Sequence, residues 1–328
     1  MTTVLDVVGL KKYFPVRRGI WQRRVGTVRA VDDVTFRVVR GETLGLVGES
    51  GCGKTTIART VVRLTTPTEG HILFDGRNLD SLNTKDLRKM RPKMQMIFQD
   101  PYSSLNPRMN VGRLIGEPLL EHSTLNKVDR RARVAELMSI VGLDPTFADR
   151  YPHEFSGGQQ QRIGIARALI LNPELVICDE PISALDVSIQ AQIMNLFKDV
   201  QDRFGLTYLF ISHDLGMIRH MCNRVAVMYL GRIAEMGLAE DIYRRPQHPY
   251  TKALLSSVPR PNRKVRRERE RIVLSGEIPS PTEPPSGCSF NTRCPFVEPQ
   301  CKEHRPELRE VAPNHQAACH LVESARVQ

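Results

Sequence analysis

A glycine-rich segment that ends in a lysine and a threonine has the composition of a phosphate-binding loop. Residues Gly48–Thr55 read Gly-Glu-Ser-Gly-Cys-Gly-Lys-Thr and match the pattern G-x-x-x-x-G-K-[ST]. They lie between the apolar run Leu44–Val47, an expected buried strand, and the helical pattern Thr55–Leu64. Glycines let backbone N–H groups turn toward phosphate oxygens, and a helix N-terminus adds partial positive charge. The context favours a nucleotide site over a chance glycine-rich turn.

The loop residues have different expected roles. The Lys54 ammonium can reach the β- and γ-phosphates, and the Thr55 hydroxyl can ligate Mg²⁺. Cys52 is expected to fill the loop without a redox role. The residues predicted to contact the nucleotide here are Gly48, Glu49, Ser50, Gly51, Cys52, Gly53, Lys54, Thr55 and Thr56.

An apolar strand that ends in two acids is the second chemical feature. Residues Leu175–Glu180 read Leu-Val-Ile-Cys-Asp-Glu. In P-loop NTPases an Asp at such a strand end holds Mg²⁺ through the metal's water shell, so Asp179 is the predicted magnesium residue. Glu180 is the candidate general base for the attacking water. A solvated loop is the alternative for two such acids, and the upstream phosphate loop argues against it.

Three further polar sites adjoin predicted elements. Ser156–Gln159 opens a helix and can present N–H donors to phosphate, although an N-cap serine in a flexible turn is the alternative. His213 follows the predicted strand Tyr208–Ile211 at the edge where α/β ligand sites gather, and is a candidate for contacting the γ-phosphate. A lone histidine is more often structural than catalytic, so the prediction for His213 rests on its position at this edge of the sheet. Gln99 likewise ends the predicted strand Met94–Phe98.

Runs typical of buried strands alternate with helical runs, which predicts an α/β fold with a parallel sheet. Residues Val4–Leu10 and Ala30–Val39 read as half-buried antiparallel strands around an irregular basic insert, 15–26, that contains Trp21. The region from about 107 to 155 is mostly helical. The other predicted elements are the strands Ile72–Phe74 and Leu175–Cys178 and the helices Asp129–Val141, Gln159–Ile170 and Ile189–Arg203.

Length and composition indicate a globular protein with a localised basic charge. The 328 residues are 41% hydrophobic and 25% charged, which excludes a wholly disordered chain and suggests about two domains. The net charge of +11 lies in two segments: residues 11–24 hold six basic residues and no acid, and residues 260–271 hold seven basic and two acidic ones. The remainder is balanced, so we expect no nucleic-acid groove. One or both segments are expected to face anionic headgroups or a partner's loops.

The tail contains four cysteines after the composition changes at Pro246. The sequence has no secretory leader and no apolar run of about 20 residues, so a cytosolic location with reduced thiols is expected. Four cysteines in such a short segment favour metal over disulfides. A [4Fe–4S] cluster is the first prediction, Zn²⁺ is the runner-up, and unligated thiols in a docking loop are the third alternative. The four residues are Cys288, Cys294, Cys301 and Cys319.

Together these motifs resemble the ATP-binding subunit of ABC transporters over residues 4–258. They occur in the family's order, which is Walker A (48–55), the Q-loop Gln99, the signature Phe-Ser-Gly-Gly-Gln (155–159), Walker B (175–180), Ser-Ala-Leu-Asp (183–186) and the switch His213. Narrower features look like the dipeptide/oligopeptide importer group, and they lie at residues 98–109, 248–259 and 287–301. The resemblance also supports the iron–sulfur cluster, because some importers of this group carry one.

The resemblance implies a P-loop NTPase cassette. Its parts would be an α/β, RecA-like core sheet, an antiparallel β subdomain and a helical signature subdomain at about 100–165. On this basis we expect an ABC ATP-binding domain at 1–258, a basic and Pro-rich linker at 259–286, and a small Cys-rich extension at 287–328.

The resemblance further implies an ATPase that powers the uptake of di- or oligopeptides. Glu180 would activate water, and His213 and Gln99 would support the γ-phosphate and Mg²⁺. Phe14 would stack on the adenine, with Tyr13 as the fallback. The Mg²⁺ residues would be Thr55, Gln99 and Asp179. An opposing subunit's ATP would meet Ser156, Gly157, Gly158 and Gln159, and Asp186 would lie in the loop that couples the two sites.

The implied partners are two transmembrane permease subunits, a second ABC ATPase packed head to tail, and an extracytoplasmic peptide-binding protein. The second ATPase is often a different chain in this group, and nucleic acid is not among the partners. The implied location is the cytoplasmic face of the cell membrane, as a peripheral subunit. Import of nickel or glutathione, a soluble ABC ATPase in DNA repair or translation, and a metal-sensing regulator are the alternatives.

Overall fold

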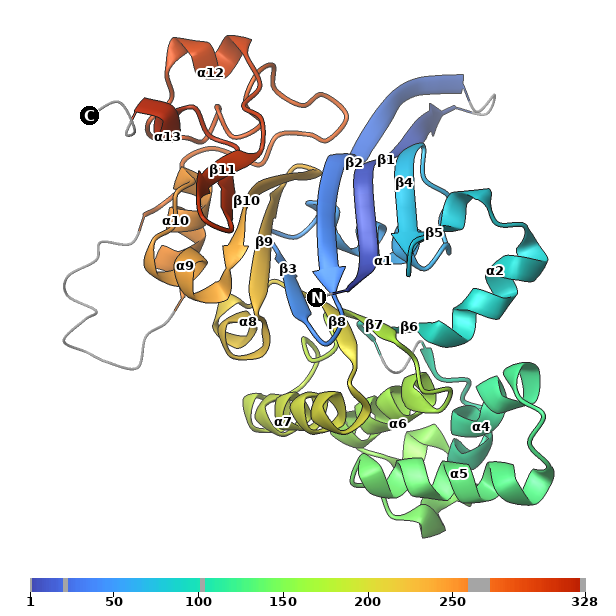
Figure 1. Cartoon of the computed structure of the whole chain (residues 1–328). Coiled ribbons are helices and arrows are strands. Elements are labelled where there is room, and N and C mark those ends of the chain that lie inside the picture. Colours follow the sequence, from blue (N-terminus) through green and yellow to red (C-terminus); the bar gives the residue numbers. More distant parts are fainter. Residues whose placement is uncertain (1, 20–22, 101–103, 259–271, 325–328) are drawn as a thin grey trace, which may run out of the picture. The chain divides into compact units, whose positions relative to one another are not determined.

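The computed structural model describes residues 2–19, 23–100, 104–258 and 272–324 (Figure 1). The chain forms two compact units. The first comprises residues 1–5, 38–43 and 73–211, and the second comprises residues 6–37, 44–72 and 212–328. Trp21 and the basic segment 260–271 lie outside the described residues. Both units combine strands with helices, which confirms the α/β class.

A parallel sheet forms the core of the first unit. Its strands lie in the order β8-β7-β6, and they are β6 (Met94–Ile97), β7 (Leu175–Asp179) and β8 (Thr207–Ser212). Every residue of β7 and β8 is buried, as expected for parallel strands covered on both faces. The helix α7 (Val187–Phe204) connects β7 to β8, and its Phe197 ring packs edge-on against Tyr208 and Phe210. This packing fixes α7 against β8.

Three further helices of the first unit pack mainly against one another (green in Figure 1). They are α4 (Val111–His122), α5 (Lys127–Ile140) and α6 (Gly157–Leu169), with 3₁₀ turns at η3 (Pro145–Asp149) and η4 (Pro152–Glu154). The predicted helix 129–141 is confirmed as α5. It begins two residues earlier because the Asn126 side chain accepts hydrogen bonds from Val128 N and Asp129 N, and it ends before Gly142 at a φ of 74°.

Short elements complete the first unit. They are β5 (Arg77–Asn78), η1 (Leu79–Ser81), α2 (Thr84–Met90) and η2 (Arg91–Lys93). The end of β4 (Glu69–Phe74) pairs with β5 across Asp75-Gly76, whose φ angles are 49° and 74°. Two successive positive φ angles are the signature of a tight hairpin turn, so the predicted strand and turn are confirmed.

The sheet of the second unit includes strands from both ends of the chain. Its order is β11-β12-β10-β9-β3, with β3 (Thr43–Val47), β9 (Arg224–Tyr229), β10 (Arg232–Leu238), β11 (Arg309–Ala312) and β12 (His315–Ala317). Strand β3 is parallel to β9, and the remaining pairs are antiparallel. The C-terminal extension therefore adds two strands to the edge of this sheet, which the sequence patterns did not predict.

Short helices flank this sheet, with α1 (Lys54–Val61) directly after the phosphate loop. The others are α8 (Leu215–Met221), α9 (Ala239–Arg244), α10 (Pro249–Ser256), α12 (Pro299–Glu303) and α13 (Leu321–Ser324). No helix among the residues that the structure describes combines the length and the apolar character needed to cross a membrane.

The prediction of an irregular insert at 15–26 is wrong for the described residues. Strand β1 (Thr3–Arg18) continues through Pro15, and β2 (Arg23–Val39) is already extended at Arg23. Hydrogen bonds between paired strands satisfy the backbone N–H and C=O groups whatever the side chains are. Basic residues on an exposed face therefore do not end a strand. Two of the basic residues make contacts within the chain. Lys11 Nζ lies 2.6 Å from Glu69 Oε2, and Lys12 Nζ donates to Thr66 O at 2.8 Å.

A buried polar pair joins the extension to the rest of the second unit. His315 Nε2 lies 2.7 Å from Glu235 Oε1, and the two side chains are 4% and 0% exposed. The Glu235 carboxylate also accepts hydrogen bonds from Gln247 N and His248 N at 2.7 and 2.9 Å. Because a buried carboxylate is costly unless it is fully hydrogen-bonded, the pair ties β12 to β10.

Replacing His315 with Leu should therefore destabilise the protein by about 2–5 kcal/mol, since it leaves part of a buried carboxylate without a partner. The measurement is the free energy of urea-induced unfolding. His304→Leu is the matched control, because that side chain is 75% exposed and its loss should change the free energy by less than about 0.5 kcal/mol. Equal unfolding midpoints for the two variants would contradict this prediction.

Candidate functional site

The phosphate loop is built where β3 meets α1 in the second unit. Gly53 is the N-cap of α1 with a φ of 107°, and a Cβ there would lie 2.1 Å from Ala30 O. A Cβ on Gly48 would lie 2.3 Å from Met228 O. Neighbouring backbone thus occupies the space that a side chain would need at both positions. These two glycines are required by close backbone approach as well as by the loop's conformation.

Lys54 lies inside this loop rather than on the surface. Its side chain is buried, and its Nζ donates to Gly48 O at 2.8 Å and to Glu49 O at 3.0 Å. The loop therefore surrounds a cation at the N-terminus of α1, an arrangement suited to phosphate. The neighbouring Cys52 thiol is buried, and burial raises its pKa, which agrees with the expected absence of a redox role.

Glu49 makes contacts that the sequence did not predict. Its backbone N–H donates to Tyr250 Oη at 3.0 Å. Its carboxylate accepts two hydrogen bonds from the Arg293 guanidinium, at 2.7 Å from Nη1 and at 3.2 Å from Nη2. Arg293 belongs to the cysteine-containing tail, 244 residues further along the chain. No local pattern could have indicated this pair.

The predicted magnesium residue Asp179 and the candidate general base Glu180 lie at the end of β7 in the first unit. Asp179 is buried, and Glu180 follows it with a positive φ of 48°, which is uncommon for a residue with a side chain. Glu180 N donates to Ile211 O at 3.0 Å, so the end of β8 holds the bend. Backbone strain held in place by surrounding structure is typical of functional positions.

Gln99 and Glu180 lie at the ends of two strands that the structure places side by side. Gln99 Nε2 donates to Glu180 Oε2 at 3.0 Å, over a separation of 81 residues. Strands β6 and β7 are adjacent and parallel, so their carboxyl ends meet at the same edge of the sheet. The Q-loop glutamine can therefore orient the candidate general base.

The signature segment forms the N-cap that is one of the two alternatives predicted for it. Ser156 is the N-cap of α6: its Oγ accepts from Gln159 N at 3.4 Å, and the Gln159 side chain accepts from Ser156 N at 3.0 Å. This reciprocal pair is a capping box. Ser156 is nevertheless exposed at a thirteen-residue helix's N-terminus, with Gly157 and Gly158 in the first turn. Its use toward a second subunit's ATP stays a prediction.

The remaining predicted site residues lie at element ends or on the surface. Asp186 is the exposed N-cap residue of α7, and exposed His213 directly follows β8. The Phe14 ring is 39% exposed, with Lys12 Nζ 4.8 Å from its centroid. The Tyr13 hydroxyl instead donates to Asp32, and burial together with this hydrogen bond raises the pKa of Tyr13 to about 12. These contacts favour Phe14 over Tyr13 for stacking on an adenine.

The four tail cysteines are near one another but do not form a prepared metal site. All four are free thiols: Cys301 and Cys319 are buried, and Cys288 and Cys294 are half-buried. Burial, with a smaller effect of the other three thiols, raises the pKa of Cys288 to about 11. Across the described residues, no group of three or more His, Cys, Asp or Glu side chains is arranged to hold a metal ion. The geometry thus does not support the predicted [4Fe–4S] cluster or zinc.

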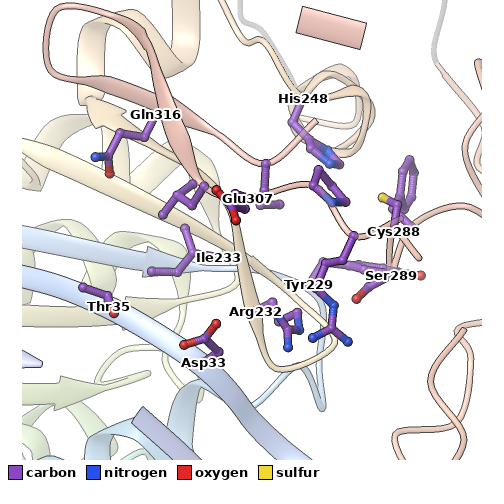
Figure 2. A pocket seen from close by; sticks show the side chains of 16 residues that line it. Asp33, Thr35, Tyr229, Arg232, Ile233, His248, Cys288, Ser289, Glu307 and Gln316 are labelled. Atoms are coloured by element: carbon purple, nitrogen blue, oxygen red, sulfur yellow. The ribbon is translucent and has the colours of Figure 1, made fainter. Parts of the chain in front are cut away.

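A cavity of about 520 Å³ also lies in the second unit, where the extension meets β10 (Figure 2). Figure 2 shows Arg232 and Ile233 of β10 on one wall and Cys288 and Ser289 of the tail on another. Arg232 is neutralised by Asp32, at 2.6 and 3.0 Å from one carboxylate oxygen. The sequence patterns predicted no cavity here, because its walls come from segments far apart in the chain.

Two family models match the chain. The model described as ABC transporter matches residues 31–183, and the model described as Oligopeptide/dipeptide transporter, C-terminal region, matches residues 234–301. The second match includes most of β10 and three of the four tail cysteines. Both matches agree with the motifs on which the resemblance was based.

Curated relatives match nearly the whole chain. The oligopeptide transport ATP-binding protein AppF of Bacillus subtilis is 58% identical over 97% of this chain and 97% of its own. The oligopeptide transport ATP-binding protein OppF of Salmonella typhimurium is 51% identical over 96% of this chain and 95% of its own.

Solved structures confirm the cassette fold. The dimeric ATP-binding cassette MJ0796 bound to ADP and Pi has a TM-score of 0.64 and 28% identity, and the match covers 72% of this chain and 98% of that one. The match with cbiO1 of Clostridium perfringens has the same TM-score at 26% identity. The chain therefore belongs to the ATP-binding proteins of ABC transporters, in the oligopeptide/dipeptide group whose C-terminal region it shares.

Proposed function

We propose that the chain is the ATP-hydrolysing subunit of an importer that takes up di- or oligopeptides. The observation that supports the ATPase activity is the structure of the loop 48–55. Its carbonyl oxygens surround the buried Lys54 ammonium at the start of α1. The substrate class is supported by the relatives at 51–58% identity, which are named oligopeptide transport ATP-binding proteins.

The predicted site residues have different roles in the proposed reaction. In the second unit Lys54 binds the β- and γ-phosphates, and the Thr55 hydroxyl is a Mg²⁺ ligand. Asp179 would hold Mg²⁺ through its water shell, and the bound ion would supply positive charge that offsets the negative charge of the phosphates. Glu180 takes a proton from the attacking water, and the Gln99 amide that donates to its carboxylate keeps it oriented.

The remaining site residues act toward nucleotide and toward a second subunit. Phe14 stacks on the adenine, and His213 contacts the γ-phosphate. The exposed α6 N-terminus at Ser156, Gly157 and Gly158 donates N–H groups to the ATP of an opposing ATPase. Asp186, at the start of α7, belongs to the loop that couples the two sites. The dimeric cassette bound to ADP and Pi supports this pairing.

The proposed assembly contains two permease subunits, a second ABC ATPase packed head to tail, and an extracytoplasmic peptide-binding protein. In it the chain is a peripheral subunit on the cytoplasmic face of the cell membrane. Its family and its relatives' names support the assembly.

Replacing Glu180 with Gln tests the hydrolytic role. We expect ATP hydrolysis to fall by about 10²–10⁴-fold, because a neutral amide cannot accept the proton from water. The dissociation constant for ATP should change by less than about threefold, since Glu180 acts in the chemical step. Release of phosphate and displacement of a fluorescent ATP analogue measure the two quantities.

The matched control is Glu136→Gln, which removes an equally sized charge from a side chain that is 49% exposed on α5. It should retain wild-type turnover. Wild-type turnover in Glu180→Gln would remove this residue from the mechanism. Loss of ATP binding in that variant would assign it a structural role instead.

Purification from the native membrane tests the transport role. Tagged protein should bring down permeases and a second ABC ATPase, and the reconstituted complex should take up labelled oligopeptides only with hydrolysable ATP. Uptake of nickel or glutathione without peptide would correct the substrate class. Recovery with ribosomes or DNA, and without membrane proteins, would overturn the transport role.

The iron–sulfur cluster is a separate proposal on Cys288, Cys294, Cys301 and Cys319. It is supported by the resemblance to the peptide importer group, although the four thiols are not arranged as a metal site among the residues that the structure describes. Bound metal requires thiolates, so uptake should release protons and strengthen as the pH rises toward the raised thiol pKa. Anaerobically purified protein should be brown, absorb near ~400 nm and hold about four irons per chain. One zinc per chain would favour a zinc site instead of the cluster. Metal-free protein would contradict both assignments.

A further inference from the structure

The phosphate loop contacts the cysteine-containing tail through one arginine. The Arg293 guanidinium and the Glu49 carboxylate form two parallel hydrogen bonds of 2.7 and 3.2 Å, and the side chains are 8% and 24% exposed. Two-point pairing of this kind restricts both distance and angle, which a single contact does not. The pair is largely shielded from solvent, so its attraction is less screened than that of a surface pair.

Glu49 is held at three points. Arg293 binds its carboxylate, Tyr250 Oη accepts its backbone N–H at 3.0 Å, and Lys54 donates to its carbonyl oxygen at 3.0 Å. The third contact is to the residue that the proposed function assigns to the phosphates. Arg293 and Lys54 therefore contact the same residue, one at its carboxylate and the other at its backbone carbonyl.

The tail is itself fixed against the same part of the second unit. Phe290 is buried, and its ring centroid lies 5.2 Å from that of Tyr229 and 5.4 Å from that of Tyr250. Arg293 N donates to Phe290 O at 3.0 Å, which closes a turn between them. Tyr250 thus contacts both the tail and the loop. The Arg293 side chain extends from a part of the tail that is packed against the unit.

Arg293 also affects the net charge of the phosphate loop. Glu49 directly follows Gly48 in the loop, and an uncompensated carboxylate at this position would repel a polyphosphate. Arg293 supplies the neutralising charge from outside the cassette motifs. The tail is then needed for the loop to be electrostatically suited to an anionic ligand.

We propose that Arg293 is a positioning residue for nucleotide binding, through which the C-terminal extension holds and neutralises Glu49 and so sets the affinity for ATP. This inference rests on the proposed function of the loop. It adds a residue of the extension to the apparatus that prepares the ATP site, although Arg293 itself need not touch the nucleotide.

The test compares the dissociation constant for ATP, KM and kcat in four variants of the full-length chain. Arg293→Met should raise the dissociation constant and KM for ATP at least tenfold and change kcat by less than twofold. Arg293→Lys, which keeps the charge but loses the paired geometry, should fall between it and wild type. Adding Glu49→Gln to Arg293→Met should restore at least half of the lost binding free energy, because no charge is then left uncompensated.

The matched control is Arg305→Met, an arginine of the same extension that lies 3.9 Å from Asp32 and not on the loop. It should bind ATP as wild type does. Wild-type ATP affinity in folded Arg293→Met, or no recovery in the double variant, would overturn the inference. If Arg293→Met does not fold, Arg293→Lys decides, since it keeps the charge but loses the paired geometry and should still raise the dissociation constant for ATP at least threefold.

Lys54→Ala separates this inference from the proposed function. Loss of ATP binding in Lys54→Ala together with wild-type binding in Arg293→Met leaves the ATPase standing and removes the role of Arg293. Wild-type ATP binding in Lys54→Ala would instead overturn the assignment of the loop, and with it the basis of the inference.

Discussion

The buried ammonium group of Lys54 is the constraint that organises the phosphate loop. A charge removed from water must be surrounded by hydrogen-bonding partners, and here the carbonyl oxygens of Gly48 and Glu49 supply them. Turning two successive carbonyls inward requires backbone conformations and close approaches that side chains at Gly48 and Gly53 would block. The strand before the loop and the helix after it keep these positions fixed. A site for phosphates is a consequence of satisfying this one cation.

Strain plays a comparable part in the first unit. Glu180 has a left-handed backbone conformation at the point where β7 stops, and its N–H is held by the carbonyl of Ile211. The bend turns the carboxylate toward Gln99, which follows the neighbouring strand. Parallel pairing of β6 with β7 is what makes two residues 81 positions apart into neighbours. The acid and the amide can therefore act as a unit.

The C-terminal extension is part of the second unit's architecture. Its strand β12 continues the sheet beside β10, and the buried pair of Glu235 and His315 ties the two strands together. Phe290 and Arg293 then reach Tyr250 and Glu49. A segment that reads as a separate cysteine-rich tail thus contributes to the surroundings of the phosphate loop. Its cysteines lie on this same connection, since Arg293 directly precedes Cys294.

The sequence by itself determined the elements and motifs that depend on local chemistry. The pattern at 48–55 requires its glycines and lysine in one turn, and the apolar runs at β7 and β8 require burial, so both could be recognised from spacing alone. The strand continuation through the basic insert was missed because backbone pairing does not depend on side-chain charge. The predicted metal site at the cysteines is likewise not supported, since spacing says nothing about thiol orientation.

Only the tertiary structure decided which distant residues meet. The pairing of Arg293 with Glu49 joins residues 244 positions apart. The place of β12 in the sheet and the cavity beside β10 likewise join segments that are far apart in the chain. Such contacts are set by the packing of whole elements, and they leave no periodicity in the chain. The motifs can be recognised from local spacing, whereas the residues that contact them from distant segments are determined by the tertiary fold.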